Sequence, residues 1–194
     1  MNLKSVNRLQ YYTNCILGYL LIACFSNCDN SGSKINSSSL ITDPGMQDSI
    51  FKTLVSFTDH SIPENELSDS LAFLVLPVEA SCPSCRKRTI DSILKNINNL
   101  IQNHYIIISA SGGYKTINSY FREQNGKLPE MKSNLFLDTT HLALKKELFE
   151  NNTVIYYTSN RKAFKKVSSI PATIREDLRE FFSGTRSDKH ITSK

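Results

Sequence analysis

The feature that most constrains this chain is a cysteine pair, Cys82 and Cys85, set between an apolar run and an amphipathic segment. The run before the pair, residues 71–78, is almost continuously apolar, which is typical of a strand buried on both faces of a parallel sheet. After the pair, apolar residues recur at helical spacing as far as residue 101, and Pro83 stands where proline is favoured in the first turn of a helix. The order strand, Cys-x-x-Cys, helix therefore predicts a dithiol at the N-terminus of a helix.

A dithiol in this position has the chemistry of thiol–disulfide exchange. Unpaired N–H groups and the dipole at a helix N-terminus stabilise a thiolate, which is the attacking species in exchange. The two intervening residues let the second sulfur reach the first, so a mixed disulfide can be resolved within one molecule. Three cations, Arg86, Lys87 and Arg88, follow the pair at once. They lower the pKa of a thiol further if they point toward it.

The rest of the chain alternates between strands and helices. Further strands are predicted at 105–109, 134–138, 154–158 and 162–167, and helical segments at 82–101, 114–124, 142–149 and 173–182. Residues 46–57 suit an irregular or helical lead-in. This order implies βαβ units and an α/β fold with right-handed crossovers. We expect one domain over residues 46–194, with a central, mostly parallel sheet, an antiparallel C-terminal hairpin and helices on both faces.

The first 23 residues have the layout of an export signal. Lys4 and Arg8 precede an apolar run at 15–25, which is shorter than the roughly 20 residues that a membrane-spanning helix needs. The run includes Leu21-Ile22-Ala23-Cys24, which resembles the lipobox of bacterial lipoprotein signal peptides. The resemblance implies that Cys24 carries a lipid and anchors the protein in the bacterial cell envelope, on its periplasmic or extracellular face. The alternative is an ordinary cleaved signal in which Cys24 is incidental.

Residues 24–45 are rich in Ser, Asn and Gly and show no periodicity. Such a composition predicts a flexible tether. Cys28 lies in this tether and has no evident partner, so it is interpreted as an ordinary thiol. The net charge of +5 is mild, and Lys and Arg are scattered from residue 86 to the end. A nucleic-acid partner is not expected, because it would need a clustered basic face.

The stretch LVLPVEASCPSCRK, residues 74–87, resembles the active-site strand, loop and helix start of the thioredoxin-like superfamily. The extra elements predicted within 114–149 make the chain most similar to the membrane-tethered TlpA/ResA-like thiol–disulfide oxidoreductases and redoxins. The resemblance implies a thioredoxin-like fold in which Cys82 attacks and Cys85 resolves. It also implies a protein thiol or disulfide as the partner, with no cofactor.

Three positions depart from the pattern of that family. Ser81 stands where a Trp commonly precedes the first Cys, and Arg88 stands where many members have Glu. Asn152 stands before Thr153, where most members have a cis-proline packed against the Cys-x-x-Cys. Because a cis bond before a residue other than proline costs about 3–4 kcal/mol, we expect a trans peptide there.

Other interpretations of the cysteine pair stay open. A disulfide on a thioredoxin fold that only binds a partner is one, since fold does not dictate function. A copper-handling site is another, in which His104 or His141 would add a third ligand to the two soft sulfurs. Haem attachment is excluded, because Arg86 occupies the place of the required His. The spacing from Pro77 to Cys82 also matches a peroxiredoxin-type loop poorly.

Overall fold

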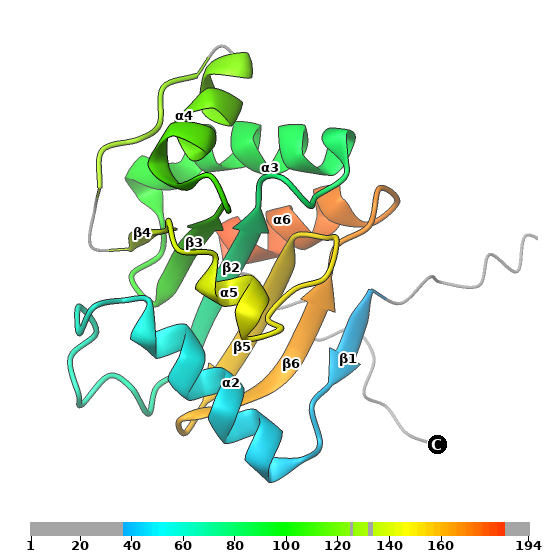
Figure 1. The fold of residues 1–194 in the computed structure, drawn as a ribbon. Coiled ribbons are helices and arrows are strands. Elements are labelled where there is room, and N and C mark those ends of the chain that lie inside the picture. The colour runs from blue at the N-terminus through cyan, green and yellow to red at the C-terminus, as the bar shows by residue number, and fades with distance from the viewer. Residues whose placement is uncertain (1–36, 125, 132–133, 185–194) are drawn as a thin grey trace, which may run out of the picture. The chain divides into compact units, whose positions relative to one another are not determined.

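A computed structural model of the chain describes residues 37–124, 126–131 and 134–184, and these form a mixed sheet with helices on both sides (Figure 1). The six described strands lie in the order β1-β6-β5-β2-β3-β4. They are β1 (Ser38–Leu40), β2 (Leu71–Pro77), β3 (His104–Ser109), β4 (Leu135–Asp138), β5 (Val154–Ser159) and β6 (Lys162–Ser168). Strands β2, β3, β4 and β6 share one direction, whereas β1 and β5 run opposite to them. The domain has the predicted α/β, thioredoxin-like fold, including the antiparallel β5–β6 hairpin.

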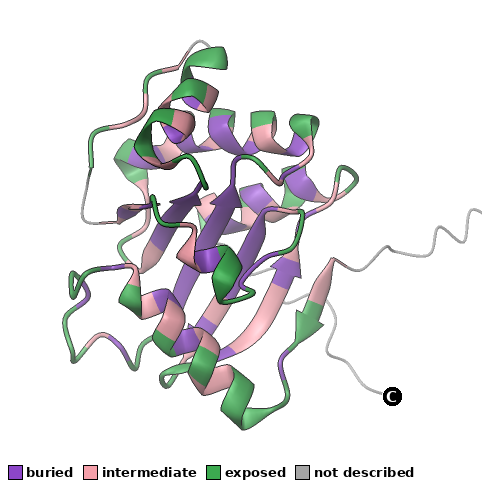
Figure 2. Ribbon diagram, in the orientation of Figure 1, coloured by how far each residue is buried: buried purple, intermediate pink, exposed green. Residues whose placement is uncertain are grey.

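Strand β2 divides the core into two halves. Its residues are all buried (Figure 2), and successive side chains point to opposite faces of the sheet. Leu74 and Leu76 pack in one half of the core, and Phe73 and Val75 pack in the other. The first half holds α3 (Pro83–Asn96), α4 (Gly113–Glu123) and α6 (Ile174–Ser183), and the second holds α2 (Pro44–Ser56) and α5 (Leu142–Lys145).

Two predicted helices are shorter than the sequence pattern suggested. The helix expected over 82–101 is α3, which ends at Asn96 and continues only as a 3-10 turn at Ile97–Asn99. Leu100 then has an extended backbone, because the chain must turn into β3. The segment expected over 142–149 is helical only at Leu142–Lys145, since the positive φ of Glu147, 56°, ends the helix. Leu148 and Phe149 are nevertheless buried in the core, which explains the apolar pattern.

The N-terminal boundary of the domain is earlier than predicted. Strand β1 pairs antiparallel with β6, with Ser38 opposite Val167. Ile41, the residue after β1, is only 8% exposed. Helix α2 begins at Pro44, where the Asp43 side chain caps it by accepting a 2.6 Å hydrogen bond from Met46 N–H. The prediction that the tether extends to residue 45 is therefore wrong for residues 38–45. These residues are mostly polar and show no strand periodicity. Backbone pairing with β6 is what makes Ser38–Leu40 a strand.

The rest of the predicted N-terminal organisation lies outside the described residues. This includes the predicted signal at 1–23, the predicted lipid on Cys24, and Cys28. Within the described ranges, no helix has the length and apolar character that crossing a membrane requires.

The boundary correction predicts that a chain starting at residue 46 is less stable than one starting at residue 37. The shorter chain loses the burial of Ile41 and the Asp43 cap, which together cost about 3 kcal/mol of the free energy of unfolding. Urea titrations of the two chains, followed by far-UV circular dichroism, measure the difference. Equal midpoints would mean that β1 does not belong to the folded unit.

Candidate active site

The cysteine pair lies where the carboxyl end of β2 meets the first turn of α3. Cys82 is the N-cap residue of α3, and Pro83 follows it within the first turn. Cys82 and Cys85 form a disulfide, with their Cα atoms 5.2 Å apart. The predicted context of strand, dithiol and helix N-terminus is therefore present.

The two cysteine residues differ in exposure. Cys85 is completely buried, at 0% exposure, whereas Cys82 is only partly buried and precedes the exposed Pro83 and Ser84. Cys85 is therefore closed to an outside molecule, whereas part of Cys82 lies at the surface. This asymmetry is what exchange through one attacking and one resolving cysteine requires.

Two groups lie within hydrogen-bonding distance of the Cys82 sulfur. The backbone N–H of Cys85 donates to Cys82 Sγ over 3.1 Å. The Ser84 hydroxyl lies 3.5 Å from the same sulfur and is able to donate to it. Both groups can stabilise a Cys82 thiolate by hydrogen bonding when the disulfide is reduced. The helix N-terminus adds to their effect.

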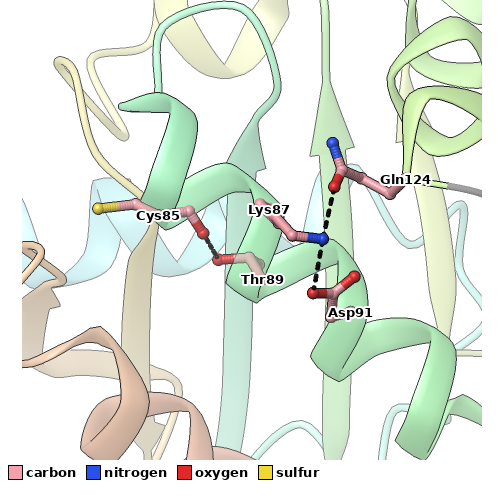
Figure 3. Close-up of polar contacts among 5 residues, drawn as sticks. All are labelled: Cys85, Lys87, Thr89, Asp91 and Gln124. Atoms are coloured by element: carbon pink, nitrogen blue, oxygen red, sulfur yellow. Dashed lines mark hydrogen bonds and ion pairs between the residues drawn. The ribbon is translucent and has the colours of Figure 1, made fainter.

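The three cations after the pair point in different directions. Lys87 Nζ binds Gln124 Oε1 at 2.9 Å and the Asp91 carboxylate at 3.3 Å. In Figure 3 the Lys87 side chain and the Cys85 sulfur leave α3 on opposite sides. Arg88 donates to the carbonyl of Pro171 beyond β6. Arg86 alone turns back toward the loop that leads into Cys82, where it donates to the Ser81 carbonyl.

A buried hydroxyl pair lies beside Cys85. The Thr89 hydroxyl donates to the Cys85 carbonyl over 2.9 Å (Figure 3) and lies 3.3 Å from the hydroxyl of Thr153, just before β5. Both threonines are 0% exposed. The pair ties the first turn of α3 to the loop before β5. This role of Thr89 was not predicted from the sequence, although a threonine four residues after Cys85 on the inward face of the helix was a usable signal.

The peptide bonds around Asn152 are trans. The described residues contain no cis peptide bond, which confirms the expectation for this position. Asn152 itself is partly buried, and Thr153 after it is fully buried. The Thr153 hydroxyl contacts Thr89 on α3.

The loop before Cys82 is held by its neighbour at the carboxyl end of β3. The exposed Glu79 carboxylate accepts hydrogen bonds from the Ser111 backbone N–H and, at 2.8 and 2.9 Å, from the Ser111 hydroxyl. The pKa of Glu79 is lowered mainly by the hydrogen bond from the Ser111 N–H. The slight burial of Glu79 opposes this shift, whereas the Ser111 hydroxyl and the electrostatic effect of His141 add to it. Glu79 therefore stays ionised and keeps the loop in place.

The two histidines considered as copper ligands lie apart from each other. His104 begins β3, opposite Ala72, and so stands at the far end of β2 from the cysteines. Its ring packs against Phe181, with centroids 4.9 Å apart, and burial lowers its pKa. His141 packs near Phe149 instead, with ring centroids 6.0 Å apart. Among the described residues, no three His, Cys, Asp or Glu side chains are grouped as a metal site would need.

Comparisons with known proteins found only low similarity. No protein-family model and no curated protein matches the chain. A solved thiol-disulfide isomerase from Corynebacterium glutamicum is 14% identical over 66% of this chain and 91% of its own, with a TM-score of 0.36. A PrxQ mutant from Xylella fastidiosa is 11% identical over 61% of this chain and 79% of its own, with a TM-score of 0.38. A thioredoxin-like protein from Aeropyrum pernix is 14% identical over 61% and 81%, with a TM-score of 0.35.

The fold and the disulfide together define the class of protein. This is a thioredoxin-like α/β domain that carries a Cys-x-x-Cys pair at the N-terminus of the helix after its central strand. The similarity of the solved structures is too low to transfer an activity, so the function rests on the geometry of the site.

Asp138, the last residue of β4, is a buried carboxylate. The Asp138 carboxylate, 3% exposed, accepts hydrogen bonds from the hydroxyls of Ser109 and Thr140 and from the N–H groups of Leu142 and Ala143. Burial raises the pKa of Asp138, but these four donors outweigh it, so the net pKa is lowered. A lowered pKa in the folded state means that the ionised carboxylate stabilises the fold above the unfolded-state pKa of about 3.9.

We therefore expect Asp138→Asn to lower the free energy of unfolding by about 2–3 kcal/mol at pH 7. The difference from the unsubstituted protein should shrink as the pH falls through the folded-state pKa of Asp138, because protonation removes the same interactions. Urea titrations at several pH values between 7 and 2 measure this. A difference that does not change with pH would contradict the assignment.

Proposed function

We propose that this protein is a thiol–disulfide oxidoreductase that exchanges disulfides with a protein partner through Cys82 and Cys85. One observation carries the proposal: Cys82 is partly exposed and its sulfur accepts an N–H hydrogen bond at a helix N-terminus, whereas Cys85, bonded to it, is fully buried. A disulfide that only braces the domain needs no such difference between its two sulfurs.

The exchange proceeds in two displacement steps. With a disulfide partner, the Cys82 thiolate attacks one partner sulfur, the partner disulfide breaks, and its other sulfur leaves with the electron pair and takes up a proton. Cys85, after losing its proton, then attacks Cys82 in the mixed disulfide, and the second partner sulfur leaves and is protonated. The partner gains two electrons and two protons, and the Cys82–Cys85 disulfide forms. The reverse sequence oxidises a partner dithiol.

The place of the reaction is also a proposal. The lipobox-like sequence Leu21-Ile22-Ala23-Cys24 supports export and a lipid on Cys24. A disulfide is most stable in an exported compartment, because cytosolic thiols are kept reduced. We therefore assign the protein to the bacterial cell envelope, with the redox domain on the periplasmic or extracellular face.

Glutathione tests the exchange chemistry. In the full chain with Cys15, Cys24 and Cys28 replaced by serine, the Cys82–Cys85 pair should have a reduction potential between about −120 and −270 mV, as exchange catalysts do. The Cys85→Ser variant should form a stable mixed disulfide with glutathione, since the resolving thiol is gone.

Cys82→Ser is the matched control for this trap. It retains one thiol, but Cys85 is buried, so mass spectrometry should find far less glutathione adduct than with Cys85→Ser. A potential below about −300 mV would identify a structural disulfide. That result, or equal adduct formation by both variants, would leave a binding module on a thioredoxin scaffold.

The anchor is tested separately by replacing the lipid-bearing residue. In a bacterial host, Cys24→Ser should move the protein from the membrane fraction to the soluble envelope fraction, because the acyl chains supply about 0.8 kcal/mol of membrane affinity per buried methylene. Cys28→Ser is the matched control and should leave the protein in the membrane fraction. Metabolic labelling with a palmitate analogue reads out the modification itself. Labelling of the Cys24→Ser variant would contradict the proposal.

A further inference from the structure

Arg86 differs from the other cations of α3 in what its side chain contacts. Its Nη1 donates to the carbonyls of Val78, over 3.0 Å, and of Ser81, over 3.3 Å, both in the loop that leads into Cys82. The guanidinium also lies over the ring of Tyr120 on α4, 4.3 Å from its centroid. Three elements therefore fix this one charge: the loop after β2, α3 itself, and α4.

The fixed position lies close to Cys82. Nη1 is 3.3 Å from the Ser81 carbonyl oxygen, and the Ser81 carbonyl carbon is bonded to the backbone nitrogen of Cys82. With standard bond lengths, the guanidinium nitrogen lies within about 7 Å of the Cys82 Cα atom. Arg86 is half-buried and its Nε is fully buried, so solvent screens the charge less than it would on an open surface.

The described contacts of Arg86 leave its charge unneutralised. Its acceptors are two neutral carbonyls and a neutral ring. Lys87, in contrast, is paired with the Asp91 carboxylate. Arg88 also binds a neutral carbonyl, that of Pro171. Pro171 follows β6, however. Strand β6 is the second neighbour of β2 in the sheet, so the two strands are about 10 Å apart.

Other titratable groups lie on the loops around the site. Glu79 precedes Cys82, and its carboxylate is held by Ser111 on the neighbouring loop. His141 lies on the β4–α5 loop, near Glu79, and the exposed Glu150 lies before β5. None of these groups is altered by substitutions in α3, so they form a constant background in a comparison of α3 variants.

We propose that Arg86 is a positioning residue that stabilises the thiolate of Cys82 and so makes the Cys82–Cys85 disulfide a stronger oxidant. This inference rests on the proposed function. Stabilising the thiolate favours the reduced form of the pair. It therefore favours the direction in which a partner thiolate attacks Cys82, the Cys82–Cys85 bond breaks, and a second partner thiol then displaces Cys82. Two electrons and two protons pass from the partner dithiol to the cysteine pair, and a partner disulfide forms.

The test compares variants that separate charge from hydrogen bonding. Arg86→Gln keeps an N–H donor for the two carbonyls but removes the charge, whereas Arg86→Lys keeps the charge. Lys87→Gln and Arg88→Gln remove the same charge from the same turn of α3 and are the matched controls. All are made in the full chain with Cys15, Cys24 and Cys28 replaced by serine.

Two readouts are measured on each variant. The first is the pKa of Cys82, from the pH dependence of its alkylation by iodoacetamide. The second is the equilibrium constant with glutathione. We take the Arg86 charge to lie about 9 Å from the Cys82 sulfur, at an effective dielectric constant of about 30. Arg86→Gln should then raise the pKa of Cys82 by about one unit and shift the equilibrium about tenfold toward the disulfide. Arg86→Lys, Lys87→Gln and Arg88→Gln should each change the pKa by less than about half a unit and the equilibrium constant by less than about threefold.

Equal shifts in Arg86→Gln, Lys87→Gln and Arg88→Gln would overturn the proposal, because only the general field of the helix would then matter. Shifts in Arg86→Lys as large as in Arg86→Gln would assign Arg86 a purely structural role and overturn it as well. Arg86→Met, which keeps the aliphatic stem over Tyr120, is measured alongside in case Arg86→Gln does not fold. The pKa is measured without any redox partner. A structural potential in the unsubstituted protein would therefore refute the proposed function without deciding the role of Arg86.

Discussion

The burial of β2 on both faces is the constraint on which the rest of this structure depends. Leu74 and Leu76 pack under α3 and α6, while Phe73 and Val75 pack under α2 and α5. A strand held from both sides cannot slip by one residue without moving every side chain to the wrong half of the core. Its carboxyl end is therefore a fixed point, and the cysteine pair begins five residues beyond Pro77.

The loop between that fixed point and Cys82 is held from two directions. Ser111 binds Glu79 from the β3 side, and Arg86 binds the carbonyls of Val78 and Ser81 from the α3 side. Rigid placement matters for exchange, because the three sulfurs of a displacement must align and any freedom of the loop adds to the barrier. The hydroxyls of Thr89 and Thr153 do the same for the buried side of the pair. The site is thus supported by local contacts of Arg86 and by two contacts, Glu79 with Ser111 and Thr89 with Thr153, between residues far apart in the sequence.

The edge strand β1 is poorly predicted by its own residues. Ser38–Leu40 contains one apolar residue, and that residue, Leu40, is 71% exposed. The order of this segment comes from backbone pairing with β6 and from Ile41, which the sheet buries. Local composition resembles a tether here because the stabilising partner, Lys165–Val167, is more than a hundred residues away. A boundary placed from composition alone therefore fell too late.

The sequence by itself determined the alternation of strands and helices, the buried central strand, and the position of Cys82 and Cys85 at the start of a helix. Each of these follows from local periodicity and from proline placement, which act over a few residues. Only the tertiary structure decided the strand order, the membership of residues 38–45, the ends of α3 and α5, and which of three adjacent cations faces the loop before Cys82. Those features depend on packing between distant segments: Arg86 turns toward Val78 because Tyr120 on another helix supports its guanidinium, and no local pattern around residue 86 contains that information.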